Sequence, residues 1–324
     1  MPSPPADDPI DVVYTWVDDA WPGYGEVLRQ SASTRHDLNP NRTRDNLQLL
    51  KYSLRSLAAF MPWTRRVYLV TCRPQVPSWL NSTSVTVVHH DEFMPREHLP
   101  TFNSFAIVSN LHRLPGLARR FVYIEDDRIL GRAVDPGDFF DETGRVRVYE
   151  ALRGTPVAAR LGAADVSPWN LALAHSNALL DARFGASRRG QLKFGLLPVD
   201  RDSWTEMIEA WPADFARTSA SRFRAQANVV PEHLYPHYLL ATARGARVGR
   251  LSMLRHAWYQ PLNNVTALQV AGMARLRWLA PKFACLNDNF GGRPNPAAVR
   301  VVQRALERWF SAPSRFEVPD GSYV

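Results

Sequence analysis

Two segments of the chain end in clustered carboxylates after a run of apolar residues. One runs from Asp11 to Asp19 (Asp-Val-Val-Tyr-Thr-Trp-Val-Asp-Asp), and the other runs from Phe121 to Asp127 (Phe-Val-Tyr-Ile-Glu-Asp-Asp). Short runs of β-branched and aromatic residues are typical of buried strands in a largely parallel sheet. Ligands of open α/β sheets bind at the carboxyl ends of the strands, and hard divalent cations prefer carboxylate oxygens. The two segments therefore predict one acidic site for Mg²⁺ or Mn²⁺ and a nucleotide pyrophosphate.

Each acidic run also has a plainer interpretation. Asp18 and Asp19 could form a solvated turn after a core strand, and so could Glu125, Asp126 and Asp127. Three adjacent carboxylates repel one another unless a cation or a guanidinium group offsets their charge, which favours a metal at the second run. Aromatic side chains beside the first run could instead stack on a base. Composition alone leaves these alternatives open.

Three further groups of residues could complete such a site. Arginines could clamp phosphate oxygens with their forked guanidinium groups, although any single arginine is more often structural. A histidine pair after a predicted strand could supply a base or a metal ligand, and an Asn-Asp-Asn cluster could bind a metal or form a turn. The members of the three groups are Arg44, Arg55, Arg113, Arg222, Arg224, His89, His90, Asn287, Asp288 and Asn289.

The composition limits the class of protein. The chain has 324 residues, of which 45% are hydrophobic and 22% charged, as in ordinary globular proteins. A net charge of +8 suits phosphorylated or polyanionic partners, and because the arginines are scattered, no nucleic acid is expected. The only cysteines, Cys72 and Cys285, exclude a disulfide framework and are expected to be free thiols. No Gly-rich phosphate loop, G-x-S-x-G or H-E-x-x-H motif occurs, which disfavours P-loop and hydrolase functions.

The location is predicted from what the sequence lacks. It contains no run of about 18 apolar residues that could span a membrane. The first eight residues show no positively charged segment followed by an apolar one, as a secretion signal would. We therefore expect a cytoplasmic protein, and its basic surface would suit peripheral association with the inner face of the membrane.

The predicted elements alternate between strand and helix, which indicates an α/β fold with a doubly wound, mostly parallel sheet and helical decoration from the C-terminal half. Residues 19–43 are polar and rich in Pro, Gly and Arg, and they predict a long functional loop. Strands are predicted over 10–17, 66–71, 85–90, 121–127 and 145–150. Helices are predicted from Leu47 to Pro62, over 101–114, within 165–193, after a capping box at Ser203, over 231–243 and over 296–310.

The chain is predicted to form a single domain over residues 9–324, after a disordered N-terminus at residues 1–8. Within it, residues 9–150 would form a nucleotide-binding α/β core, and residues 151–324 a helical part on the acceptor side.

Taken together, these segments resemble the Stealth family of sugar-phosphate transferases. That family includes bacterial capsular polysaccharide phosphotransferases and the animal lysosomal-enzyme N-acetylglucosamine-1-phosphotransferase. Four family blocks occur in the family order and cover about residues 9–290: Ile10–Asp18, a long second block from Arg44 to Asp127, Phe215–Arg224 and Phe283–Asp288.

The resemblance implies a reaction in exopolysaccharide or capsule synthesis. A hydroxyl of a glycan acceptor attacks the β-phosphorus of a UDP-sugar, UMP leaves, and a sugar-1-phosphate is joined through a phosphodiester. A divalent cation, Mg²⁺ or Mn²⁺, and arginines would neutralise the phosphate charge.

The resemblance also assigns roles to residues, position by position. Asp18, Asp127 and Arg224 match family acids and the family arginine and would act in catalysis, with His90 as a further catalytic candidate. Metal ligands would be Asp126, Asp127 and Asp288. The donor would be bound by Tyr14, Thr15, Trp16, Arg44, Arg55, Asn103, Arg113 and Arg222.

Five positions depart from the family pattern. Glu125 stands where Asn is usual, Val108 and Asn110 replace a Glu and a His, and Asn228 replaces an Asp. Most seriously, Phe194 stands where a favoured catalytic His begins a His-x-Pro-His segment. Phe cannot take a proton, so another group would have to do so. The available candidates are His90, His112, His233 and Asp200.

Two alternative functions remain beside the transfer of a sugar-1-phosphate. A metal-dependent glycosyltransferase would also place an acid-tipped strand at a nucleotide sugar, but it would release UDP. A catalytically impaired relative that only binds would fit the missing His. The nucleotide released from a UDP-sugar distinguishes these functions.

Overall fold

The computed structural model describes residues 8–34, 36–155, 166–192, 196–249 and 256–318. Its main sheet has the strand order β3-β2-β1-β4-β9. All neighbours in it are parallel except β9, which pairs antiparallel with β4 at one edge. The strands are β1 (Ile10–Thr15), β2 (Val67–Thr71), β3 (Thr86–His89), β4 (Arg120–Glu125) and β9 (Leu197–Asp200). The predicted α/β fold with a mostly parallel sheet is confirmed.

A second sheet continues directly from the first. Strand β4 ends at Glu125 and β5 begins at Arg128, so only Asp126 and Asp127 separate the two sheets. The second sheet consists of β11 (Ala257–Leu262), β12 (Phe283–Asp288) and β5 (Arg128–Leu130), in that order. Two small pairs complete the strands: β10 (Gly245–Arg247) with β6 (Val146–Val148), and β7 (Glu150–Gly154) with β8 (Gly190–Leu192).

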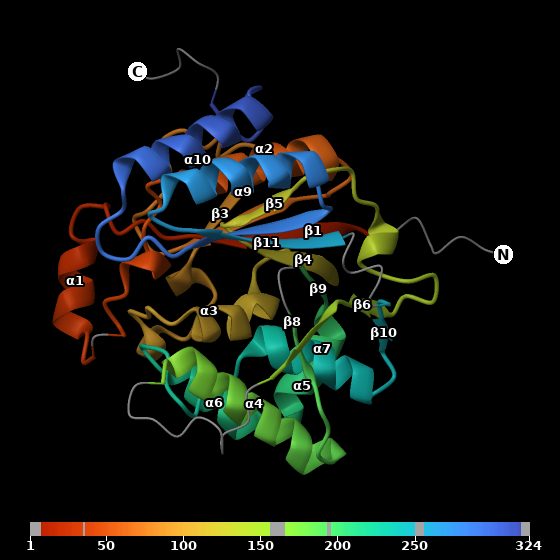
Figure 1. Cartoon of the computed structure of the whole chain (residues 1–324). Helices are drawn as coiled ribbons and strands as arrows, with labels where there is room; N and C mark the ends of the chain where they lie inside the picture. Colours follow the sequence, from red (N-terminus) through yellow and green to blue (C-terminus); the bar gives the residue numbers. More distant parts are fainter. Residues whose placement is uncertain (1–7, 35, 156–165, 193–195, 250–255, 319–324) are drawn as a thin grey trace.

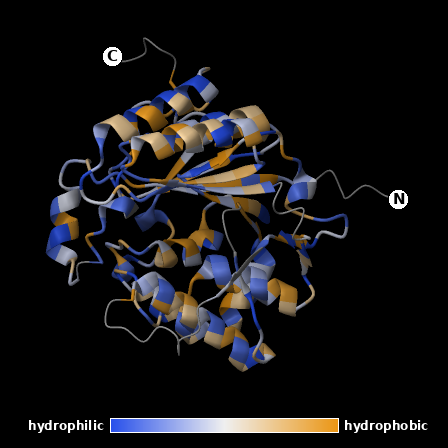
Figure 2. Cartoon of the chain, in the orientation of Figure 1, coloured by the Kyte–Doolittle hydropathy of each residue, from blue (hydrophilic) through white to orange (hydrophobic). Residues whose placement is uncertain are grey.

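Helices cover both faces of this strand layer. Figure 1 shows α2, α9 and α10 on one side, and α3 together with α4–α7 on the other. Figure 2 shows mostly hydrophobic strands between helices that combine hydrophobic and hydrophilic residues. The helices are α1 (Tyr24–Ser31), α2 (Leu49–Phe60), α3 (Ser104–Asn110), α4 (Pro168–Phe184), α5 (Arg201–Ala210), α6 (Pro212–Ala220), α7 (Pro231–Ala241), α9 (Thr266–Leu279) and α10 (Pro296–Trp309). Short 3₁₀ turns are η1 (Pro40–Arg42), η2 (His90–Glu92), η3 (Arg96–His98), η4 (Leu111–Arg113) and η5 (Pro136–Asp138).

Helix α2 forms as its apolar spacing predicts. Leu50, Leu54 and Leu57 are all buried in the main core against the sheet. The helix begins where the Asp45 carboxylate accepts a hydrogen bond from the Leu49 backbone N–H at 2.9 Å. An acid at this end satisfies an otherwise unpaired N–H and suits the helix dipole. A second hydrogen bond, from the Trp16 indole N–H to Asp45 Oδ2 at 2.8 Å, holds Asp45 close to the end of β1.

Several local predictions were wrong, each for a physical reason. The predicted loop 19–43 contains helix α1, and α9 was not predicted at all, because its apolar residues lie all around the helix rather than in one stripe. The capping residue of α5 is Asp200, whose carboxylate accepts a hydrogen bond from the Ser203 N–H at 3.0 Å, so Ser203 is inside the helix. The helix predicted from residue 101 begins only at Ser104, because the Asn103 side chain caps it.

Two predictions remain untested: the disordered N-terminus and the division of the domain at residue 150. The N-terminal prediction falls on residues 1–8, of which 1–7 lie outside the described residues. The C-terminal half supplies not only helices but also β9 of the main sheet and two strands of the second. The division at residue 150 therefore remains a proposal. Among the described residues, no helix combines the length and hydropathy needed to cross a bilayer.

Candidate active site

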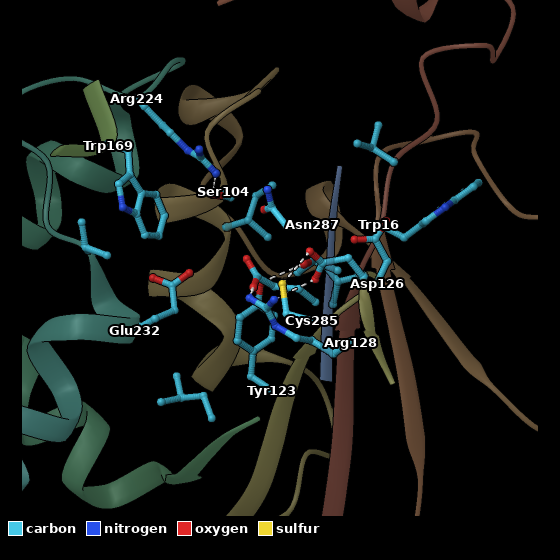
Figure 3. Close-up of a pocket in the computed structure, with 18 of the residues that line it drawn as sticks. Trp16, Ser104, Tyr123, Asp126, Arg128, Trp169, Arg224, Glu232, Cys285 and Asn287 are labelled. Atoms are coloured by element: carbon cyan, nitrogen blue, oxygen red, sulfur yellow. Dashed lines mark hydrogen bonds and ion pairs between the residues drawn. The ribbon is translucent and has the colours of Figure 1, made fainter. Parts of the chain in front are cut away.

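A cleft of about 600 Å³ opens where β1 and β4 end. These strands are neighbours in register, with Thr15 opposite Glu125, so the residues that follow them emerge side by side. Figure 3 shows that side chains from widely separated parts of the sequence converge on it. Of the residues predicted from sequence, the cleft is lined by Thr15, Trp16, Arg44, His90, Asp126, Asp127, Arg224 and Asp288.

The turn after β4 crowds charged groups at the bottom of the cleft. Arg128 pairs with Glu125 and lies 3.2 Å from Asp127, close enough for an ion pair but too poorly aligned for a hydrogen bond. The other Asp127 oxygen, Oδ2, accepts a hydrogen bond from the Cys285 thiol at 3.4 Å. Asp127 Oδ1 is buried, and no hydrogen-bond donor in the described part of the chain reaches it. One arginine therefore offsets only part of the charge of this turn.

The electrostatics of this turn disfavour ionised carboxyls. Burial raises the pKa of Asp126 well above its usual value, and the charges of Asp127, Asp45 and Glu125 raise it further. Burial likewise raises the pKa of Asp127, although Arg128 opposes the shift. Asp45 is a third such acid: burial raises its pKa to about 6, even though the Trp16 indole N–H donates to its Oδ2 at 2.8 Å. A bound cation would relieve the repulsion in this part of the cleft.

The opposite wall carries a guanidinium group without an acidic partner. Arg224 lies over the rings of Phe105 (4.8 Å) and Trp169 (5.3 Å), and its Nη2 donates to the Ser104 hydroxyl at 2.6 Å. Among the described residues it forms no ion pair. Burial lowers the pKa of Arg224, and the charges of Glu232, Glu125 and Tyr123 oppose the shift. A half-buried guanidinium without an ion-pair partner is stabilised by an anion, so this wall is suited to phosphate.

Asn103 holds the segment that carries Arg224. Its amide N–H groups donate to the Ser221 and Phe223 carbonyls and to the Asn228 side chain at 2.9–3.2 Å. The Phe102 N–H adds a hydrogen bond to the Arg222 carbonyl at 2.8 Å, while the Arg222 side chain is exposed. Neither Asn103 nor Arg222 lines the cleft, so both position Arg224 rather than contact its ligand directly.

The carboxylates after β1 are engaged differently. Asp18 accepts a hydrogen bond from the Ala20 N–H at 3.0 Å, and its backbone is bridged by the side chain of Gln75 at 2.9 and 3.0 Å. Asp19 accepts a hydrogen bond from the Thr43 hydroxyl at 2.9 Å. Asp18 does not line the cleft, although its charge adds to the raised pKa of Asp45 after the larger effect of burial. Its catalytic role remains a prediction.

Arg44 and Asp288 line the cleft but largely neutralise each other. Two nitrogens of Arg44 donate to the Asp288 carboxylate at 2.6–3.1 Å, and a third contacts the Gly291 carbonyl at 2.8 Å. In the described part of the chain, no group of three His, Cys, Asp or Glu side chains is arranged to hold a metal ion. The predicted set of Asp126, Asp127 and Asp288 is thus not assembled, because Asp288 is bound to Arg44. Asp126 and Asp127 still fit a cation, since Asp127 Oδ1 has an ion-pair contact with Arg128 but no hydrogen-bond donor among the described residues.

Besides Asn103 and Arg222, three more residues predicted to bind the donor lie outside the cleft lining. Tyr14 is buried in the core, where its hydroxyl contacts Ser53 at 2.9 Å. Arg55 holds the Glu317 carboxylate at 2.6 and 2.9 Å and so fastens the C-terminal segment to α2. Arg113 is exposed and donates to Asn110 at 3.3 Å. All three have contacts within the protein, and their role in donor binding remains a prediction.

Of the four candidates for a proton acceptor, two line the cleft and two do not. His90 and His233 line the cleft, but burial lowers the pKa of His90 to about 4 and that of His233 well below its usual value. His112 and Asp200 do not line it. The departure at Phe194 lies outside the described residues.

Sequence reasoning missed several residues of the cleft. Cys285 belongs to a predicted block and Arg128 directly follows one, but nothing in their spacing revealed that they would flank Asp127. Asp45, which lies beside the cleft rather than in its lining, follows Arg44 in a predicted block, yet its contact with Trp16 joins residues 29 positions apart. Glu232, which lines the cleft from the first turn of α7, follows Pro231. Pro-Glu at a helix start is common, so it gave no functional signal.

Comparison with known proteins identifies family profiles that match two regions of the chain. Residues 42–148 match the profile described as "Stealth protein CR2, conserved region 2", and residues 196–241 match "Stealth protein CR3, conserved region 3". Between them these regions contain Arg44, Asp126, Asp127 and Arg224.

Curated relatives extend over almost the whole chain. The exopolysaccharide phosphotransferase SCO6021 of Streptomyces coelicolor is 36% identical over 96% of this chain. The exopolysaccharide phosphotransferase CpsY of Mycobacterium leprae is 33% identical over 95% of it. The chain spans only 58% and 57% of these relatives. Among solved structures, one match is the galactosyltransferase LgtC in complex with donor and acceptor sugar analogues. The match covers 96% of this chain and 98% of the LgtC chain, at 11% sequence identity. Its TM-score is 0.42, which is too low to support an argument.

Proposed function

The chain belongs to the Stealth family, and from this premise we propose that it transfers a sugar-1-phosphate from a UDP-sugar to a hydroxyl of a glycan acceptor. UMP is the leaving group, and the product is a phosphodiester. The curated relatives are named exopolysaccharide phosphotransferases, which supports phosphotransfer in exopolysaccharide synthesis for this chain too. The donor, the acceptor and the released nucleotide are the parts of the proposal that go beyond those names.

One observation carries the proposal more than any other. Arg224, buried against Trp169 and without a carboxylate partner among the described residues, faces the same cleft as the crowded carboxylates after β4. A diphosphate needs positive charge on its oxygens, which Arg224 supplies on one wall. On the other wall, Asp126 and Asp127 are suited to a cation that would neutralise the remaining oxygens. A neutral ligand would leave both walls uncompensated.

The divalent cation, Mg²⁺ or Mn²⁺, would be held by Asp126 and Asp127, and when bound it would supply charge neutralisation at the phosphates. Asp288 is less suited, because Arg44 already holds it in two hydrogen bonds. The paired Arg44 and Asp288 instead brace the loop after η1 against β12. Thr15 and Trp16, at the end of β1, are placed to line the nucleoside end of the donor site.

The proposal is tested by the nucleotide that turnover releases. The purified protein is incubated with several UDP-sugars, an oligosaccharide acceptor and Mg²⁺ or Mn²⁺, and the nucleotides are separated by chromatography. Release of UMP together with a phosphodiester product is the expected result, and chelation of the cation should stop it. Release of UDP would instead establish a glycosyltransferase, for which an acid-tipped strand is equally suitable. Binding of UDP-sugar without turnover would indicate a relative that has lost catalysis.

The place of action is part of the same proposal. A UDP-sugar donor suits the cytoplasmic location predicted from sequence, and the basic composition suits glycan or lipid-linked acceptors that carry negative charge. Sedimentation with anionic vesicles, compared with neutral ones, would test the predicted peripheral association with a membrane.

A further inference from the structure

Glu232 occupies the wall of the cleft opposite the end of β4. It is in the first turn of α7 and follows Pro231, so its backbone is fixed by a rigid helix start. Figure 3 shows its carboxylate on the same side of the cavity as Trp169, across from Tyr123 and Asp126. The side chain lines the cleft. It therefore faces the space in which an acceptor and a sugar phosphate would meet.

One oxygen of the Glu232 carboxylate lacks a hydrogen-bond donor. This oxygen, Oε2, is buried, and no donor among the described residues reaches it. A buried acceptor left without a donor costs roughly 1–3 kcal/mol, and such groups are rare in folded proteins unless they serve a function. A hydroxyl group entering the cleft would satisfy this oxygen. The geometry thus points to an O–H donor as the missing partner.

The groups around Glu232 set how strongly it holds a proton. They are Glu125 and Tyr123 on β4, Arg128 on β5, Arg224 on the preceding segment and the neighbouring His233. Burial and, to a smaller extent, the charge of Glu125 raise the pKa of Glu232 to about 7, although Arg224 and Arg128 oppose the shift. A group that is partly deprotonated at neutral pH, yet basic enough to accept a proton, suits general base catalysis.

The other side chains in the cleft are less suited to this task. The ring of His90 lies edge-on to Phe93, with centroids 6.4 Å apart, and its pKa is lowered to about 4. His233 lies 4.6 Å from the His237 ring and is held neutral by burial. Asp126 and Asp127 are required for the charge of the donor. Asp37 also lines the cleft away from the turn after β4, but its Oδ2 already accepts hydrogen bonds from the Ser33 and Thr34 N–H groups at 3.0 and 2.8 Å. Glu232 differs from it in having a buried carboxylate oxygen that no donor among the described residues reaches.

We propose that Glu232 is the residue that takes the proton from the attacking hydroxyl of the acceptor. This rests on the proposed function and names its missing base. The acceptor oxygen forms a bond to the β-phosphorus as its proton passes to the Glu232 carboxylate. The bond from that phosphorus to the bridging oxygen breaks, and its electron pair leaves with UMP. Loss of the proton from Glu232 to solvent completes the cycle, so a carboxylate on α7 does what Phe194 cannot.

The experiment compares Glu232→Gln with Glu232→Asp and with Glu209→Gln, a matched change on the exposed side of α5. Turnover is followed as nucleotide released in the presence of acceptor, and UDP binding is measured by calorimetry. A general base contributes about 100- to 10,000-fold, so Glu232→Gln should lower kcat by that factor. Its UDP affinity should stay within about threefold of wild type, because the amide is isosteric. Glu232→Asp should recover part of the rate, and Glu209→Gln all of it.

The pH dependence provides a readout that a merely structural role would not change. In wild type, kcat should rise with pH to a plateau above about 7, because the base must be deprotonated. This rise should be absent in Glu232→Gln. Wild-type kcat in Glu232→Gln, or a loss of rate matched by an equal loss of UDP binding, would overturn the proposal. If wild type releases UDP instead of UMP, the proposed function fails, yet the same comparison on that turnover still decides whether Glu232 deprotonates the acceptor.

Discussion

The ends of β1 and β4 carry the same signal in sequence but do different things in the structure. Both strands are buried, parallel and adjacent, and both end in neighbouring carboxylates. After β1, Asp18 and Asp19 satisfy N–H and O–H groups of their own loops. After β4, Asp126 and Asp127 crowd into the cleft, and Asp127 Oδ1 has no hydrogen-bond partner. Acids that stabilise a turn and acids that await a ligand are thus distinguished by their partners, not by their spacing.

The largest expected effect concerns Asp127. Asp127→Asn removes the charge that a cation and a diphosphate would need, which is worth several kcal/mol, so kcat should fall by about 1,000-fold. Circular dichroism should show an unchanged fold, since Cys285 can still donate to the amide oxygen. Wild-type turnover in this variant would mean that the turn after β4 is not the site.

The second effect concerns the anion side of the cleft. Arg224→Ala removes charge-assisted hydrogen bonds worth roughly 1.5–3 kcal/mol, so UDP should bind about 10- to 150-fold more weakly by calorimetry. Arg113→Ala, on an exposed turn, is the matched control and should bind UDP like wild type. Equal affinities of the two variants would show that Arg224 does not contact the diphosphate.

The third prediction concerns stability. Whereas the first two substitutions weaken function, this one should stabilise the metal-free protein. Because burial and neighbouring charges raise the pKa of Asp126, the folded protein keeps this proton at a pH where the unfolded chain, titrating near 3.8, has lost it. The metal-free protein should therefore lose stability as pH rises above that value. Asp126→Asn should weaken this trend and raise Tm at pH 8 by a few degrees, measured by calorimetry, while abolishing the stabilisation that Mn²⁺ gives wild type. If Asp126→Asn instead had a lower Tm than wild type at pH 8, repulsion between Asp126 and its neighbouring carboxylates would not be what destabilises the metal-free protein.

The smallest effect belongs to β1. Asp18→Ala removes the hydrogen bond to the Ala20 N–H, at a cost of about 0.5–1.5 kcal/mol in the free energy of unfolding, measured with urea. Turnover should fall far less than in Asp127→Asn. A loss of rate as large as that of Asp127→Asn would erase the difference between the two strand ends and support the catalytic role that the resemblance implies for Asp18.

The sequence allowed the sheet and the acidic turn to be predicted, because strands and strand ends are local features. It did not reveal which acids were free. Arg44 meets Asp288 across 244 positions, and Arg55 meets Glu317 across 262, so two arginines expected at phosphate were already paired. Glu232 escaped notice for the converse reason: its importance lies in a partner that is missing, and only the folded arrangement shows this.

The hydrogen bonds of Asn103 have a consequence for how this part of the molecule can diverge. One amide group fastens the segment both before Arg224, at Ser221, and after it, at Asn228. The exposed residues Ala225 and Gln226 lie between these anchors. Substitutions there should be tolerated without moving the guanidinium group. Descendants of this sequence could therefore diverge at these two surface positions while the place of Arg224 in the cleft is inherited unaltered.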